Sequence, residues 1–74
     1  MPPLPILSGK AVVRAFEDLG WKFSRQRGSH KILVKPGHPA TLSVPDQKTV
    51  AAGTLRSLIR SAGVTVEQFI ESVR

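Results

Sequence analysis

The tripeptide Gly28-Ser29-His30 combines residue types that can handle a phosphodiester. A histidine imidazole gives or takes a proton near neutral pH and can therefore serve as a general acid or base. Gly28 allows a tight turn or a close approach of the backbone to a ligand. Ser29 adds a hydroxyl that can hold a phosphate oxygen or orient the imidazole. In a basic chain, this pattern favours proton transfer beside a phosphate, as in RNA cleavage, over passive binding.

Basic residues surround the tripeptide at a density greater than solubility requires. Five cations and no acid lie between residues 22 and 35: Lys22, Arg25, Arg27, Lys31 and Lys35. Such a run favours contact with phosphates over a merely solvated surface. Together with Gly28 and Ser29, these five residues are the predicted RNA-binding set. Arg56 and Arg60 either extend this set or pair with an acidic partner.

The setting of His30 leaves two interpretations open. Strict alternation along a strand places His30 on the same side as Ile32 and Val34, so His30 is buried if that side faces the core. A position at the first residue of the strand, or a bulge, would instead leave the imidazole accessible. A histidine that only packs or hydrogen-bonds within a strand is therefore the alternative to a catalytic one.

The second histidine, His38, is expected to be an exposed loop residue in the turn Pro36-Gly37-His38-Pro39. A strand separates it from His30 by roughly 15–20 Å, which argues against a direct acid/base pair and against a shared metal ion. No metal or other cofactor is expected. Trp21 is expected to pack in the core rather than to stack on a base.

Length and charge limit the classes of protein to consider. The chain has 74 residues, a net charge of +6 and no cysteine. It is expected to form a single domain over residues 1–74, with a thin core and no disulfide. The charge fits a nucleic acid, an anionic membrane surface or an acidic protein as partner. Neither a signal peptide nor a membrane-spanning apolar run is recognised, so the cytoplasm is the expected location.

Turn and capping signals divide the chain into three helices and three strands. Residues 1–7 are proline-rich and predict an extended N-terminal arm. Helices are predicted over 9–19, 50–62 and from 66 onward, with Ser8, Thr49 and a Thr65/Gln68 capping box at their starts and Gly20 and Gly63 closing the first two. Strands are predicted over 21–26, 30–35 and 40–44. The fold class is α+β: a three-stranded antiparallel sheet with helices on one face and the other face open.

Short motifs throughout the chain follow the order found in HicA-type toxins, and the chain resembles that family. They are Ser8-Gly9-Lys10, Leu19-Gly20-Trp21, Gly28-Ser29-His30, Gly53-Thr54-Leu55, Leu58-Ile59-Arg60, Ala62-Gly63 and Thr65-Val66-Glu67-Gln68-Phe69. The resemblance implies a fold like that of double-stranded-RNA-binding domains. It also implies metal-independent cleavage of mRNA, with His30 as the catalytic residue, and a HicB-type antitoxin that covers the active site.

The sequence therefore predicts a small endoribonuclease toxin. Two other classes remain: a non-catalytic RNA-binding module that uses the same basic face, and an interaction protein whose charge serves to dock an acidic partner.

Overall fold

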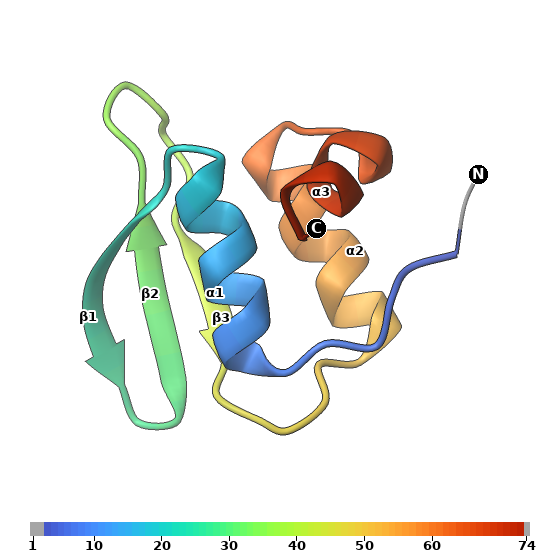
Figure 1. Ribbon diagram of the computed structural model, residues 1–74. Helices are drawn as coiled ribbons and strands as arrows, with labels where there is room; N and C mark the ends of the chain where they lie inside the picture. Colours follow the sequence, from blue (N-terminus) through green and yellow to red (C-terminus); the bar gives the residue numbers. More distant parts are fainter. Residues whose placement is uncertain (1–2, 74) are drawn as a thin grey trace.

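The first helix, α1 (Gly9–Asp18), begins after the predicted cap, Ser8, and ends one residue earlier than predicted (Figure 1). The Ser8 hydroxyl accepts a hydrogen bond from the Ala11 N–H at 3.2 Å. Leu19 is the C-cap, and Gly20 follows it with a φ of 99°, a conformation that favours glycine. The computed structural model describes residues 3–73, so the first two residues of the predicted arm lie outside the described part.

The three strands form the predicted antiparallel meander. They are β1 (Lys22–Arg27), β2 (His30–Val34) and β3 (Leu42–Pro45), and β2 lies between the other two. The third strand begins two residues later than predicted and includes Pro45. Because β3 is an edge strand, the missing N–H of Pro45 is tolerated there.

The second helix, α2 (Ala52–Ala62), begins later than predicted and without the predicted cap. Its N-cap is Ala51, which makes no side-chain cap hydrogen bond, so the assignment of Thr49 as the cap is wrong. Tertiary packing decides the start instead: Val50 is buried, and its N–H donates to the Leu7 carbonyl at 2.8 Å. The predicted end is confirmed, since Gly63 has a φ of 74°.

The third helix, α3 (Val66–Val73), begins with the predicted capping box. The Thr65 N–H donates to Gln68 Oε1 at 2.8 Å, and the Gln68 N–H donates to Thr65 Oγ1 at 3.0 Å. The helix packs on α1 and α2 rather than on the sheet (Figure 1). This arrangement places its Phe69 within the core.

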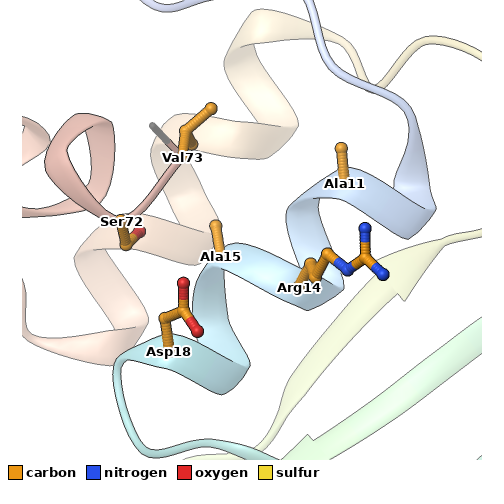
Figure 2. A pocket seen from close by; sticks show the side chains of 6 residues that line it. All are labelled: Ala11, Arg14, Ala15, Asp18, Ser72 and Val73. Atoms are coloured by element: carbon orange, nitrogen blue, oxygen red, sulfur yellow. The ribbon is translucent and has the colours of Figure 1, made fainter.

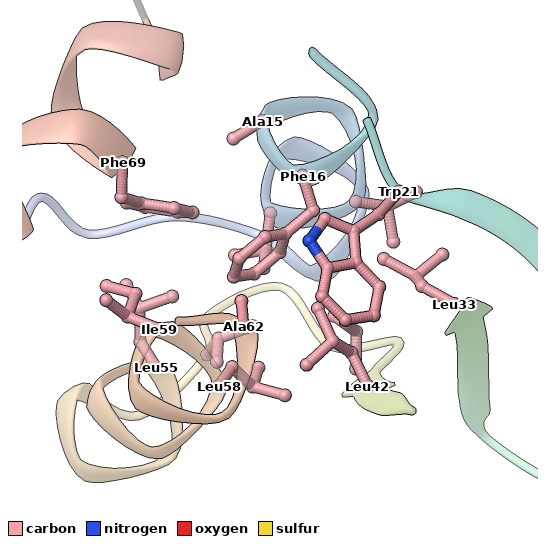
Figure 3. Packing of buried hydrophobic residues seen from close by; sticks show 14 residues of the cluster. Ala15, Phe16, Trp21, Leu33, Leu42, Leu55, Leu58, Ile59, Ala62 and Phe69 are labelled. Carbon is pink, nitrogen blue, oxygen red and sulfur yellow. The ribbon is translucent and has the colours of Figure 1, made fainter. Parts of the chain in front are cut away.

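Aromatic side chains from three segments meet at the centre of the core (Figure 3). The ring centroid of Phe16 lies 5.1 Å from that of Phe69 and 6.5 Å from that of Trp21. Trp21 is 1% exposed, which confirms its prediction as a core residue. Among residues 3–73, no polar or charged side chain is buried. The core is therefore held together almost wholly by apolar packing.

The described part of the N-terminal arm lies against the domain. Leu4 and Leu7 are half-buried and pack on the core, whereas Ile6 is exposed. The hydrogen bond between Leu7 and Val50 joins this segment to the start of α2. Residues 3–7 of the arm have no regular secondary structure, yet they take part in the fold.

The helices and the sheet form the predicted layers. Helix α1 packs on β1 and β3, and α2 packs on β3, so the helices cover one face of the sheet (Figure 1). The α+β prediction is confirmed, with the order α-β-β-β-α followed by a C-terminal helix. Within the described residues, the opposite face of the sheet carries no helix.

Candidate nucleic-acid interface on the open sheet face

A two-residue turn places His30 at the start of the central strand. Arg27 and His30 are directly opposite each other on β1 and β2, and Gly28 and Ser29 join them. Gly28 has a φ of 58°, the left-handed conformation that short hairpin turns require. The Ser29 carbonyl accepts a hydrogen bond from the Asp46 N–H at 2.7 Å, which ties the turn to the end of β3.

The side chain of His30 points away from the helices. Leu33 is fully buried, so its side of β2 faces the core. His30, Ile32 and Val34 alternate with Leu33 and therefore share the open face. His30 is exposed, and Ile32 and Val34 are half-buried. The prediction that His30 shares one side of the strand with Ile32 and Val34 is confirmed. The imidazole is accessible rather than buried, because the core lies on the other side of the strand.

A bulge at Ser24 determines which face the arginines of β1 occupy. Phe23 pairs with Leu33 and Arg25 pairs with Ile32, so Ser24 has no partner on β2. Strict alternation would have placed Arg25 on the same side as Phe23. The extra residue turns Arg25 to the open face instead, an effect that bulges commonly have next to functional sites.

The bulge thus gathers cations on the face that carries His30. Lys22 pairs with Val34, Arg25 with Ile32 and Arg27 with His30. These three cations, with His30, Ile32 and Val34, are called here the open-face site. Within residues 3–73, the side chains of Lys22, Arg25 and Arg27 have neither an ion-pair nor a hydrogen-bond partner. Their charge is therefore available to an anionic ligand.

Four of the five acidic residues lie on helices, away from this face: Glu17 and Asp18 on α1, and Glu67 and Glu71 on α3. The fifth, Asp46, follows β3 at the end that adjoins the turn before His30. No carboxylate is carried by any of the three strands. The sheet therefore presents one sign of charge to an approaching phosphate.

Two of the predicted RNA-binding lysines, Lys31 on β2 and Lys35 just after it, lie on the side of the helices. Lys31 pairs with Gln26 and with the fully buried Val44. The Lys35 ammonium donates to the Leu19 carbonyl at 3.2 Å, at the C-terminal end of α1. Cations stabilise that end of a helix. The open-face site therefore contains Lys22, Arg25 and Arg27, but neither Lys31 nor Lys35.

Sequence reasoning did not identify Ser43 as a neighbour of His30. Ser43 is exposed and pairs with Ile32, while His30 pairs with Pro45 on the same strand. Ser43 therefore lies on the diagonal from His30, within reach of a ligand that contacts both. The sequence signal was the strand alternation with Leu42 and Val44, which are both buried.

The expectation that His38 is exposed is wrong. Its imidazole is half-buried and lies against Trp21, with ring centroids 4.9 Å apart. Its Nδ1 accepts a hydrogen bond from the Ala40 N–H at 3.2 Å. The ring contact joins residues far apart in the sequence, which local turn signals do not reveal. His38 is thus a packing residue of the loop between β2 and β3.

Two hollows of the surface lie among the helices, outside the open-face site. One of about 290 Å³ lies between α1 and α3 and is lined by Ala11, Arg14, Ala15, Asp18, Ser72 and Val73 (Figure 2). Another, about 230 Å³, is on the helix layer and includes Arg56 and Arg60. These two arginines therefore do not extend the open-face site. Across residues 3–73, no group of three or more His, Asp or Glu side chains is placed to hold a metal ion.

In the described part of the chain, no helix has the length and apolarity needed to span a membrane.

Comparison with known proteins identifies the family of the chain. A search of curated proteins gives no match. The family model described as the HicA toxin of bacterial toxin-antitoxin matches residues 9–64, from the start of α1 to just beyond α2. The chain belongs to the HicA toxin family of bacterial toxin–antitoxin systems.

Proposed function

We propose that this protein is a metal-independent endoribonuclease that cleaves mRNA in the cytoplasm with His30 as general acid or base. The observation that carries the proposal is the convergence of one exposed imidazole and three unpaired cations on the open-face site. Membership of a toxin family supports the same conclusion. Cleavage of mRNA would give such a toxin its effect on the cell.

In the proposed reaction, an RNA 2′-hydroxyl attacks the adjacent phosphorus. The bond from phosphorus to the 5′-oxygen breaks, leaving a 2′,3′-cyclic phosphate and a 5′-hydroxyl. His30 accepts the proton of the attacking hydroxyl or donates one to the leaving oxygen, a role worth about 10²–10⁴-fold in rate. Arg27 faces His30 directly and stabilises the negative charge on the phosphoryl oxygens.

The remaining proton transfer belongs to a second group. Ser29 adjoins His30 in the chain, Ser43 lies on its diagonal, and a water molecule reaches an exposed site without hindrance. Each of these groups can exchange a proton with the reacting oxygens. Ser43→Ala and Ser29→Ala variants, assayed for cleavage, distinguish the two hydroxyls from water.

The test of the proposal compares the wild type with His30→Ala. Because the His30 side chain is exposed, its removal leaves the core intact, and Trp21 emission and circular dichroism stay unchanged. Cleavage falls by at least about 10²-fold while RNA affinity is kept. Wild-type cleavage by the variant would refute the catalytic role. Binding without cleavage by the wild type would instead indicate an RNA-binding module, and failure to bind RNA at any salt concentration would indicate a docking protein.

Cleavage is proposed to need no metal ion. The charge on the phosphate is handled by arginine and lysine side chains of the open-face site. Activity should therefore persist in excess EDTA. Loss of activity that magnesium or manganese restores would show that a bound cation performs this task.

A HicB-type antitoxin is the proposed inhibitor. Its proposed binding surface is the open-face site, whose positive charge fits an acidic protein. Binding would exclude RNA and would also raise the melting temperature of the toxin by mass action. An antitoxin that binds but leaves cleavage unchanged would contradict this mode of inhibition.

A further inference from the structure

The cations of β1 follow one another along the strand at nearly equal backbone intervals. Their partners on β2 are Val34, Ile32 and His30, which are spaced two residues apart. Two residues of a strand span about 6.7 Å. Lys22, Arg25 and Arg27 are therefore set about 6.7 Å apart along the strand direction. Because of the bulge at Ser24, two residues of β1 rather than one lie between Lys22 and Arg25.

This interval is similar to the distance between consecutive phosphates in an extended single strand of nucleic acid. Proteins that bind single strands use such rows of cations to follow the backbone. The row also has a direction, because only its Arg27 end faces His30. A phosphate at Arg27 is thus beside the imidazole, and further phosphates lie at increasing distance from it.

An apolar strip runs beside the row. Ile32 and Val34 are half-buried on the open face and lie opposite Arg25 and Lys22. Bases that leave the phosphates toward β3 would rest on these aliphatic side chains. A duplex holds its bases inside its helix, so its bases would not rest on the strip.

We propose that β1 is a three-phosphate track for single-stranded RNA that leads to His30. Arg27 holds the scissile phosphate, Arg25 the next phosphate on one side of the cut and Lys22 the phosphate after that. The inference rests on the proposed function for the position of the cut, and it adds the register of the substrate and its single-stranded form.

The first experiment uses oligonucleotides with one ribonucleotide in an otherwise 2′-O-methyl chain, so that cleavage occurs at one phosphate only. The chain is lengthened by one nucleotide at a time on either side of the cut. Lys22→Ala should lower kcat/KM about two- to fivefold, the effect of an exposed ion pair, only when two phosphates follow the scissile one on one side. Arg25→Ala should do so from the first added phosphate.

Arg60→Ala is the control, because it removes the same charge from the helix layer. It should leave kcat/KM unchanged at every length. An equal effect of Lys22→Ala at every length, or an effect of Arg60→Ala as large as that of Lys22→Ala, would overturn the track.

The second experiment measures binding alone, so it remains informative if the protein does not cleave RNA. Fully 2′-O-methyl tetrauridylate carries three phosphates and no attacking hydroxyl. The slope of log affinity against log salt should become less steep by about 0.7 in Lys22→Ala, which corresponds to one lost phosphate contact. The same four-nucleotide sequence, placed within a stable duplex, should bind more weakly than the single strand. An unchanged slope, or tighter binding of the duplex, would refute the track whatever the outcome of the cleavage assay.

Discussion

Arg27 lies directly across the β1–β2 hairpin from His30, with only Gly28 and Ser29 between them. In this arrangement the charge that stabilises a phosphate and the group that moves a proton belong to one rigid turn. Arg27→Ala should therefore lower kcat far more than it raises KM, by about 10²-fold if the guanidinium acts mainly in the transition state. Arg27→Lys should restore part of the rate. Steady-state cleavage kinetics check this, and an effect confined to KM would reduce Arg27 to a binding residue.

Lys35 should contribute to the stability of the fold and not to RNA binding. Its ammonium binds the Leu19 carbonyl at the end of α1, where a cation contributes about 0.3–1 kcal/mol. Lys35→Ala should lower the free energy of unfolding by that amount and leave the salt dependence of RNA binding unchanged. Urea unfolding followed by Trp21 emission measures the first quantity, and fluorescence anisotropy measures the second. A less steep dependence of RNA affinity on salt in Lys35→Ala would show that Lys35 does contact RNA.

Gly9 should resist substitution although it begins a helix. A Cβ at this position would clash with the Pro45 carbonyl oxygen and would lie 3.0 Å from the Asp46 Cα. Gly9→Ala should destabilise the protein by about 1–3 kcal/mol, as overpacking does. Because the Asp46 N–H holds Ser29, cleavage should also fall.

Gly53→Ala is the matched control for Gly9→Ala. It lies in the first turn of α2, and no atom lies within 4 Å of its added Cβ. This change should stabilise the protein by about 0.5–1 kcal/mol through helix propensity. Thermal melting compares the two variants, and equal effects of the two would contradict the close approach at Gly9.

Deletion of Ser24 should remove the bulge and leave the cations beside His30. Without the unpaired residue, Phe23 still pairs with Leu33 and Arg25 with Ile32 in regular alternation, so both arginines of β1 stay on the open face. The salt slope of RNA binding and the rate of cleavage should therefore stay close to those of the wild type. Ser24→Ala keeps the bulge and should behave in the same way. A salt slope less steep by about 1.4 in the deletion variant, for two lost phosphate contacts, would contradict this pairing.

His38 should contribute to stability through its ring contact with Trp21. His38→Ala removes this contact and the acceptor for the Ala40 N–H, and should lower the free energy of unfolding by about 1–2 kcal/mol. Below the melting temperature, cleavage should remain at the wild-type rate. Loss of cleavage in a folded His38→Ala protein would point to a second histidine in the reaction.

Local signals predicted those parts of the fold that depend on neighbours in the sequence. The pair Thr65 and Gln68 forms its capping box because both partners lie within one helical turn. The start of α2 could not be predicted in this way. Its position follows from the bond between Val50 and Leu7, which lie more than forty residues apart.

The sequence predicted the charged residues and the histidine of the open-face site, but not the face of the sheet on which the arginines lie. The run from Lys22 to Arg27 contains one apolar residue, Phe23, so its hydrophobic pattern does not specify a register. Ser24 carries no signal that distinguishes a bulge from a regular strand position. The faces of Arg25 and Arg27 became clear only from their pairing with β2.

The irregular, charged character of β1 also bears on how the protein avoids aggregation. β1 is an edge strand, and its Phe23 side chain is 49% exposed. A flat, apolar edge strand pairs readily with the edge of another copy, whereas a bulge and repelling charges such as those of β1 oppose this pairing. Variants that remove the charge of Lys22 or Arg25 therefore also lose part of this protection. Their solubility will decline at high concentration, and a partner that neutralises the strand must at the same time cover its free edge.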